Sequence, residues 1–369
     1  MKQQLTNADI FKVMEAWAPK SLAYDWDNVG LQIGSNNRPV KKVMVTLDVL
    51  EEVADEAIAN HVDLVIAHHP LLFKSLSRID TEQPKGRTIQ KLLAKNISVY
   101  AAHTNLDVAA GGVNDMLFEA LQLQDKEVLL PTQAEELYKL AVYVPISHQE
   151  DIMHAWAKTD AGHIGAYSHC TFRTQGKGTF KPLEGTNPYI GKQQEISFVD
   201  EVRMETIVKK SRLADTIKAM IAAHPYEEVA YDVYPLENKG ELMGLGRIGT
   251  LEKQMNLKEL CEFVKTALSV PAVRVTGDLT KSIKKVAVLG GSGEKYFMDA
   301  KRKGADAYIT GDVTFHAAQD AEQIGLAVID PGHHVEKIMT VKTQAYLREK
   351  FPDLEIITSN VHTEPFQFM

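Results

Sequence analysis

The segment VDLVIAHHPLLFKS, residues 62–75, indicates the fold, because a near-continuous apolar run ends there in two adjacent histidines. An apolar run without polar alternation is typical of a strand that is buried on both faces of a parallel sheet. In a regular strand, His68 and His69 would point to opposite faces. Pro70 cannot continue the hydrogen-bonded ladder, because it has no backbone N–H. We therefore expect the strand to end at the two histidines, where a turning backbone lets the imidazoles reach two metal ions.

Strand and helix patterns alternate on both sides of this segment. Strands separated by helices of this length suggest right-handed βαβ units and a parallel sheet, which is the α/β class. The first half has predicted strands over residues 41–49, 62–70 and 97–107, and predicted helices over residues 50–61, 86–96 and 111–123. The alternation returns with strands over residues 284–293, 305–312 and 326–334, and a long final helix begins near residue 335.

The two alternating segments can be laid over each other. VIAHHP (65–70) falls on YITGDV (308–313), and AAHTNLD (101–107) falls on VIDPGHH (328–334). This suggests a weak internal duplication, in which two pseudo-repeated βαβ-type halves form one domain. The alternative is that any two α/β segments share such a rhythm, and the pattern alone does not decide between the two explanations. The two halves are residues 1–131 and 240–369.

The middle of the chain, residues 132–239, has a different pattern. Two strand–helix units flank a Gly-, Thr- and Pro-rich segment, residues 176–191, that reads as a loop. This order predicts a small α+β domain of ferredoxin-like type. Its ends lie where the α/β alternation stops and resumes, so an inserted domain is the simplest account.

Composition excludes several classes of protein. A chain of 369 residues with 44% hydrophobic and 24% charged residues is ordinary for a globular protein of two domains. The net charge of −8 gives no basic field for nucleic acid or anionic membranes. The only two cysteines, Cys170 and Cys261, argue against a disulfide scaffold. The start has no signal-peptide pattern, and no apolar stretch approaches the roughly 20 residues of a membrane span, so we expect a cytoplasmic protein.

Three clusters of histidine and carboxylate residues follow predicted strands, at residues 68–69, 103–107 and 333–336. Ligands bind beyond the carboxyl ends of strands in parallel α/β sheets, so we expect these clusters at one edge. Imidazole and carboxylate are ligands for Zn and similar divalent ions. His333 and Glu336 are three residues apart, on one face of a helical turn. Alternatively, each histidine makes only a structural hydrogen bond. The five candidate ligands for two ions, with either carboxylate able to bridge, are His68, His69, Asp107, His333 and Glu336.

Other residues near these strand ends have possible supporting roles. His103 and His316 are candidate catalytic proton carriers, because imidazole titrates near neutral pH, although a structural hydrogen bond is as good an explanation for His316. Asp312 is a candidate for orienting a ligand. Asp27 and Asn28 either order the edge of the site or only shape a turn. Residues 289–295, LGGSGEK, either hold an anion on backbone N–H groups or form a plain glycine turn.

Six motifs occur in order along the two outer segments: WDNVGLQIG, IAHHPLLF, AAHTNLDVAAGGVND, GLGRIG, YITGD and IDPGHHVEK. Together they resemble the dinuclear-metal-centre family of GTP cyclohydrolase 1 type 2 homologues. The middle segment is similar to the PII and CutA group of trimeric signalling domains. The resemblance implies a two-metal site on the five candidate ligands and a ring-shaped homohexamer whose metals face an internal cavity.

The resulting functional hypothesis is a metal-dependent hydrolase with two divalent ions per chain. Zinc is the first candidate, and Mn, Fe, Co or Ni also suit these ligands. The resemblance implies opening of the guanine ring of GTP, a small-molecule substrate. The residues alone equally suit phosphoester hydrolysis. A metal-loaded scaffold or regulator without enzymatic activity is the third hypothesis, and a membrane or nucleic-acid partner is not expected.

Overall fold

The computed structural model describes residues 4–369 and has the mixed α/β class that the sequence predicts. The chain divides into two compact units, one formed by Met1–Thr132 with Met243–Met369 and the other by Gln133–Leu242. None of the helices among the described residues is long and apolar enough to cross a membrane. The unit boundaries lie one and three residues from the predicted limits at residues 132 and 239.

The first sheet of the larger unit is built around the opening segment of the sequence. Its strand order is β1-β4-β3-β2-β13, in which β1 is antiparallel and the other neighbours are parallel. All residues of β3 and β4 are buried, as the uninterrupted apolar runs predict. The strands are β1 (Gly30–Ile33), β2 (Lys42–Thr46), β3 (Leu64–Ala67), β4 (Ser98–Ala101) and β13 (Glu355–Thr358). Helices α1 (Asn7–Trp17), α2 (Glu51–Ala59), α3 (Pro84–Ala94), α4 (Thr104–Val108) and α5 (Val113–Ala120) connect or precede them.

The second group of strands in the larger unit has the order β8-β10-β11-β12-β9. Its three middle strands are parallel, while β8 and β9 are antiparallel to their neighbours. The strands are β8 (Tyr231–Asn256), β9 (Arg274–Thr276), β10 (Ser282–Ser292), β11 (Ala307–Gly311) and β12 (Ala327–Asp330). The helices are α8 (Leu257–Leu268), α9 (Phe297–Arg302), α10 (Phe315–Gln323) and α11 (Ile338–Lys350).

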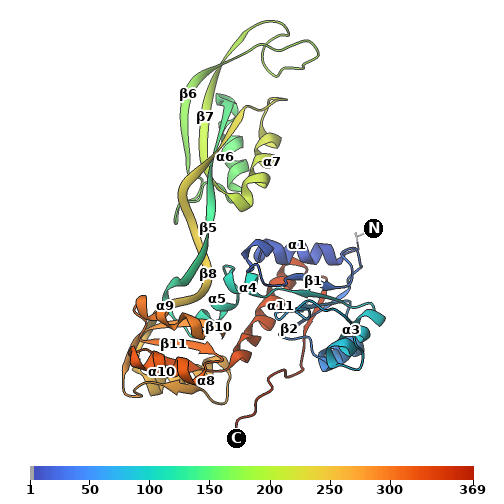
Figure 1. Ribbon diagram of the computed structural model, residues 1–369. Coiled ribbons are helices and arrows are strands. Elements are labelled where there is room, and N and C mark those ends of the chain that lie inside the picture. The colour runs from blue at the N-terminus through green and yellow to red at the C-terminus, as the bar shows by residue number, and fades with distance from the viewer. Residues whose placement is uncertain (1–3) are drawn as a thin grey trace. The chain divides into compact units, whose positions relative to one another are not determined.

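One hydrophobic core joins the two groups of strands. Val43 and Ile66 of the first sheet belong to the same buried cluster as Val286 and Ile309 of the second. The opposite face of the first sheet packs in a separate cluster under α2 and α3. Helix α11 contacts α5, β2 and β13, and Figure 1 shows it between the two groups of strands. The carboxyl ends of both parallel sets thereby belong to one compact unit.

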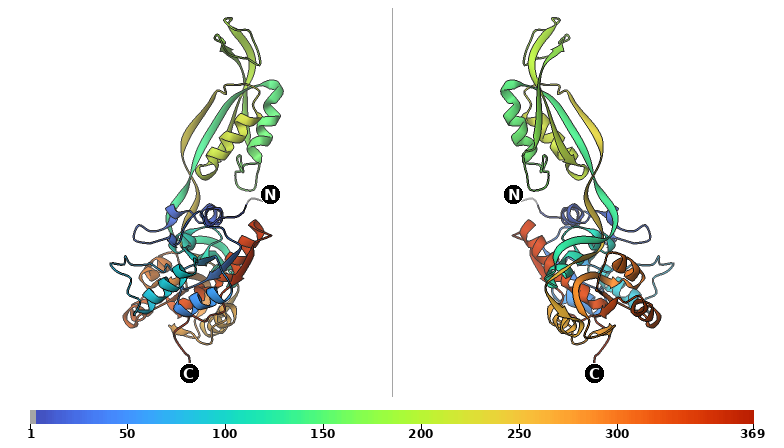
Figure 2. Two further views of the ribbon diagram at one scale, coloured as in Figure 1. Left: turned by 90° about the vertical axis from the view of Figure 1, so that its right-hand side faces the viewer. Right: turned by 90° about the vertical axis from the view of Figure 1, so that its left-hand side faces the viewer.

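The smaller unit is an antiparallel sheet with two helices on one face. Strand β7 (Ser197–Lys209) pairs with β5 (Gln124–Pro145) on one side and with β6 (Thr171–Phe180) on the other. Helices α6 (Gln149–Ala157) and α7 (Leu213–Ala223) lie on the same side of these strands in Figure 2. Their core includes Trp156 and Met220. Strands β5 and β8 are long and have residues in both units.

The predicted loop over residues 176–191 is partly wrong, because residues 176–180 continue strand β6. Gly178 explains the error. A Cβ at this position would lie 2.0 Å from Oε2 of Glu201, so the missing side chain makes room for a neighbour across the sheet. Glycine in a strand can mark such a close approach rather than a turn.

A buried ion pair connects α5 to β8 within the larger unit. Nε of Arg247 donates to Oδ1 of Asp115 at 2.7 Å, and both side chains are almost fully buried. Nη1 of Arg247 also donates to the carbonyls of Gly244 and Gly246. Burial raises the pKa of Asp115, but the bonds to Arg247 outweigh burial and lower it. Both charges are therefore compensated, and removing one leaves the other buried without a partner of opposite charge.

We predict that Arg247→Met lowers the free energy of unfolding by about 3–5 kcal/mol, because the buried Asp115 carboxylate loses its partner. Lys126→Met is the matched control, since Lys126 also lies 3.0 Å from Asp115 but is half exposed. We expect that control to cost less than about 1 kcal/mol. Urea unfolding, monitored by hydrogen exchange in peptides of α5 and β10, measures the free energy of unfolding of this unit. Equal losses in the two variants would contradict the prediction.

Candidate metal centre

The predicted clusters meet at the carboxyl ends of the parallel strands. His68 and His69 follow β3, His103 follows β4, and His333 begins a 3₁₀ helix, His333–Lys337, shortly after β12. The ring of His69 lies 5.1 Å from those of His68 and His333, and the His68 and His103 rings are 5.2 Å apart. The backbones of His68 and His69 still donate to the carbonyls of Thr46 and Leu47. Both imidazoles nevertheless face one cluster, with their planes tilted by 46°.

Each of the four histidines is held through Nδ1. For His68 the acceptor is the carbonyl of Ala102, 2.8 Å away. A carbonyl only accepts, so the proton of a neutral His68 sits on Nδ1 and the lone pair of Nε2 faces the cluster. The Nδ1 atoms of the other three contact carboxylates that are not candidate ligands, here called the outer carboxylates, as metal-ligating histidines commonly do. These contacts are His69 with Asp48 at 2.7 Å, His103 with Asp27 at 2.9 Å and His333 with Asp312 at 2.7 Å.

Glu336 lies at the centre of the cluster. Its Oε2 is 3.1 Å from Nε2 of His69 and 3.1 Å from Nε2 of His333, and 3.7 Å from Nε2 of His68. The spacing of three residues between His333 and Glu336 fits the 3₁₀ helix, in which residues i and i+3 eclipse. The pair therefore lies on one face, as expected.

Two buried atoms in the cluster lack a hydrogen-bond partner among the described residues. They are Nε2 of His68 and Oδ1 of Asp107, which lie 3.6 Å apart. An unsatisfied buried polar group costs about 1–3 kcal/mol, so such atoms need an explanation. A divalent ion would satisfy both, and the donor chemistry of imidazole and carboxylate fits one. The structure thus contains a group of side chains that could hold metal.

The donor atoms form three overlapping groups in which every atom lies within 4.8 Å of the others. The groups are His69, His333 and Glu336; His68, Asp107 and Glu336; and His68, His69 and His103. All five predicted ligands are included, together with His103.

The pKa values of several side chains in the cluster are strongly shifted from their usual ranges. Burial and the neighbouring Glu336 charge raise the pKa of Asp107 to about 8. Burial lowers the pKa of His69, but bonds to Asp48 and Glu336 outweigh it and raise the value to about 10. Likewise, burial is outweighed at His333, where the bond to Glu336 raises the pKa to about 9. Burial raises the pKa of Glu336, but its histidine bonds hold it well below its usual range.

Two glycines allow Glu336 to approach β10. A Cβ at Gly290 would lie 2.9 Å from Oε1 of Glu336, and one at Gly291 would lie 2.7 Å from it. The φ of Gly291 is also +63°, which glycine adopts easily. The LGGSGEK segment is therefore explained first by close packing. No evidence in the structure assigns it an anion.

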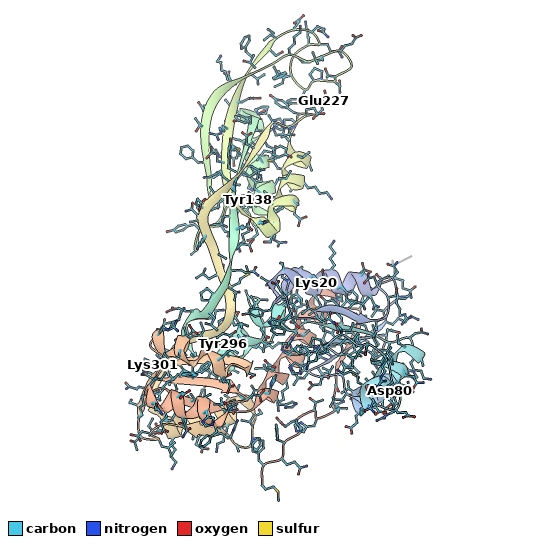
Figure 3. The ribbon with its side chains drawn as sticks, in the orientation of Figure 1. Lys20, Asp80, Tyr138, Glu227, Tyr296 and Lys301 are labelled. Carbon is cyan, nitrogen blue, oxygen red and sulfur yellow. The ribbon has the colours of Figure 1, made fainter. Side chains whose placement is uncertain are left out.

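A cleft of about 420 Å³ opens onto the cluster. Its lining includes the aromatic residues Tyr24, Trp26 and Phe73, and also Ser292 and Lys295. Tyr296, labelled in Figure 3, also lines the cleft. Burial and the nearby Tyr296 raise the pKa of Tyr24 to about 12. The Tyr24 phenol is therefore neutral at ordinary pH.

The remaining predicted residues have different positions. His316 is exposed on α10, where Nδ1 contacts the side chain of Gln319, and the structure does not bring it to the cluster. The prediction rests on the titration of imidazole near neutral pH, which carries no information about where α10 places this side chain. Asp312 supports His333, as expected. Asp27 orders the edge of the site through His103, whereas Asn28 donates to the carbonyl of Leu72.

Sequence reasoning missed two residues of the site. Asp48 follows the buried strand β2, and the same strand-end argument would have found it. Asn114 was harder to find, because it acts on backbone groups: Nδ2 donates to the carbonyl of Asp107, and Oδ1 accepts from the N–H of Gly290. It links the metal-facing segments of the two halves.

We predict that divalent metal binding releases protons at pH 7 and strengthens as the pH rises from about 6 to 8.5. Asp107, His69 and His333, with pKa values of about 8, 10 and 9, must each lose a proton to act as ligands. Calorimetric titration with Co²⁺ in buffers of different ionisation enthalpy measures the number released. Asp107→Asn should release about one proton fewer. Metal affinity independent of pH would contradict this charge assignment.

Comparison with known proteins identifies the family. The model of the family Duf34/NIF3 (NGG1p interacting factor 3) matches residues 5–365. A Bacillus subtilis protein named GTP cyclohydrolase 1 type 2 homolog is 53% identical over the full length of both chains, and a Halalkalibacterium halodurans protein of the same name is 50% identical over 98% of each. The crystal structure of a Bacillus cereus protein related to NIF3 has a TM-score of 0.93 at 50% identity, covering 100% of both chains. The predicted resemblance is confirmed, and the chain belongs to the Duf34/NIF3 family.

Proposed function

We propose that this protein is a metal-dependent hydrolase that binds two divalent ions per chain. The observation that carries the proposal is the sharing of Glu336 by two donor groups. One contains His69 and His333, and the other contains His68 and Asp107. Two ions held by these groups would be bridged by the Glu336 carboxylate. The partnerless atoms of His68 and Asp107 support the assignment.

We propose zinc as the first candidate, because three neutral imidazoles and two carboxylates suit it. Mn, Fe, Co and Ni suit the same donors, and availability decides among them. Bound divalent ions lower the pKa of water to about 7 and stabilise charge that develops on oxygen. The chain itself holds the imidazole donors in position through the outer carboxylates of Asp48, Asp27 and Asp312, and the cleft gives access to these donors.

His103 is proposed as the catalytic proton carrier. Asp27 accepts from its Nδ1, so Nε2 is available to accept or donate a proton in the cleft. Asp27 also accepts from the backbone N–H of Thr104 at 3.0 Å and from its hydroxyl, which fixes the carboxylate. The alternative role is metal ligand, since the donor atom of His103 also lies within 4.8 Å of those of His68 and His69. A variant at His103 distinguishes the two roles.

The substrate proposal rests on the relatives. Their printed name, GTP cyclohydrolase 1 type 2 homolog, makes hydrolytic opening of the guanine ring of GTP the first reaction to test. Phosphoester hydrolysis is the second, because two-metal centres also serve phosphatases and nucleases. A closed site without room for substrate would favour a structural or regulatory role, but here a cleft reaches the donors.

Further parts of the sequence-based hypothesis remain proposals. We propose that the two parallel strand groups are duplicated halves. The parallel run β2-β3-β4 in one group and the parallel run β10-β11-β12 in the other support this, because each has an antiparallel strand, β1 or β9, beside its last strand. We also propose that residues 132–239 are an inserted PII/CutA-like domain, supported by two helices on one face of an antiparallel sheet. The ring-shaped homohexamer and the cytoplasmic location are proposed from the sequence alone.

We expect the metal-reconstituted full chain to contain about two ions and to turn over at least one member of a panel of GTP, other nucleotides and phosphoesters. Asp107→Asn should lose about one ion per chain and at least 100-fold in turnover, because it removes a ligand charge. Asp320→Asn is the control, since Asp320 is exposed on α10. Elemental analysis and product detection measure both effects. No turnover with Zn, Mn, Fe or Co would refute the hydrolase proposal.

We expect His103→Gln to keep about two ions per chain but to lower turnover by roughly 10²–10⁴-fold, as removal of a general acid–base group does. His61→Asn, at an exposed position after α2, is the matched control and should behave as wild type. Metal content and initial rates are measured on the same preparations. Loss of an ion in His103→Gln would instead identify His103 as a ligand.

A further inference from the structure

The motif WDN, residues 26–28, holds an exposed indole at the edge of the cleft. Trp26 is 56% exposed, whereas Trp156 is buried and Trp17 is partly buried. The two residues that follow Trp26 are held by hydrogen bonds. The metal cluster itself does not require Trp26, because the donor atoms come from other residues. The exposure of this ring therefore needs its own explanation.

Asp27 and Asn28 fix the position of Trp26. The Asp27 side chain is fully buried and bonds to His103 at 2.9 Å and to the backbone of Thr104 at 3.0 Å. Nδ2 of Asn28 donates to the carbonyl of Leu72 at 2.7 Å. The first contact joins the motif to the metal cluster, and the second joins it to the loop that carries Phe73. The indole is thus held in place before any ligand binds.

The rings around Trp26 form an aromatic wall. Tyr24 lies parallel to Trp26, with centroids 5.7 Å apart and planes at 9°. Phe73, which is 44% exposed, contacts Trp26 edge-on at 5.9 Å. His103 is also edge-on to both Trp26 and Phe73, at 6.3 and 6.1 Å. The wall therefore begins at the proposed proton carrier and extends outward along the cleft.

We propose that Trp26 and Phe73 form a binding site for a flat aromatic ring of the substrate. An exposed, preorganised indole offers a large apolar surface and loses little conformational entropy when a ring stacks on it. Because the wall contacts His103, a ring held there lies next to the reacting part of the substrate. Trp26 is thereby a specificity-determining residue that favours aryl and heteroaryl substrates over alkyl ones. This inference rests on the proposed function of the same cleft.

The test compares ligands that share an anionic group and differ in the ring. Phenylphosphonate carries a ring bonded directly to phosphorus, and benzylphosphonate carries the ring one carbon further away. Methylphosphonate carries no ring. Calorimetric titration into the zinc-loaded full chain gives a Kd for each, without any need for turnover. Stacking of a ring on an aromatic side chain contributes about five- to hundredfold in affinity. We expect at least one ring-bearing phosphonate to bind at least about fivefold more tightly than methylphosphonate to wild type.

Three variants locate the effect. Trp26→Ala should reduce the aryl-to-methyl ratio to below about twofold, whereas Trp26→Phe, which keeps a stacking ring, should retain most of it. Phe315→Ala is the matched control, because Phe315 is an aromatic residue of the same unit, 72% exposed on α10 and outside the cleft. It should leave the ratio unchanged. Thermal unfolding and metal content confirm that each variant keeps the folded, loaded site.

A ratio near one in wild type, no binding of any phosphonate, or an unchanged ratio in Trp26→Ala would overturn the proposal. Loss of oligomer size in Trp26→Ala with an unchanged ratio would instead assign the indole to a contact with a second copy, which also overturns it. The outcome is separate from that of the hydrolase proposal. If ring-dependent binding is present but no substrate in the panel is hydrolysed, the aromatic site stands and the enzymatic function fails.

Discussion

The carboxylate of Glu336 is the group on which the site depends. One of its oxygens lies 3.1–3.7 Å from three imidazole nitrogens that come from the ends of two different strands. Raised pKa values at His69 and His333 allow protons to balance this buried charge. A divalent ion can replace those protons, because it supplies positive charge to the same atoms. The contacts of Glu336 therefore bring the candidate ligands together around one carboxylate.

The fold supplies this geometry through two sets of parallel strands with one core. The carboxyl ends of β3 and β4 face the segment after β12, and α5 with its Asp115–Arg247 pair fixes one set against the other. Asn114 bridges the backbones of Asp107 and Gly290 across the same interface. A shift between the two sets would separate His69 from Glu336. The contacts that stabilise this interface are consequently the same contacts that assemble the site.

The sequence predicts the centre of the fold better than its edges. The buried strands around His68 and His103 have uninterrupted apolar runs, which identify them directly. Strands β1, β9 and β13 were not predicted, because each lies at an edge of its sheet and has partly exposed residues instead of an uninterrupted buried run. The candidate ligands were predictable because they follow strands. His316 also follows one, but the loop of residues 312–314 separates β11 from α10, and periodicity cannot reveal the direction in which that loop turns.

The sequence singles out Asp27 and Asp312 as supporting residues, but not the histidine that each one contacts, because these contacts are made through space. The two carboxylates nevertheless decide which nitrogen each histidine offers. Their exposure differs: the Asp27 side chain is fully buried, whereas that of Asp312 is 45% exposed. Asp312 also adopts a φ of +57°, which costs a non-glycine residue about 1–2 kcal/mol. That backbone places its carboxylate 2.7 Å from Nδ1 of His333, so local strain is offset by a charge-assisted hydrogen bond. The His103 side of the site is therefore rigid and shielded, while the His333 side is held by a contact that solvent can reach.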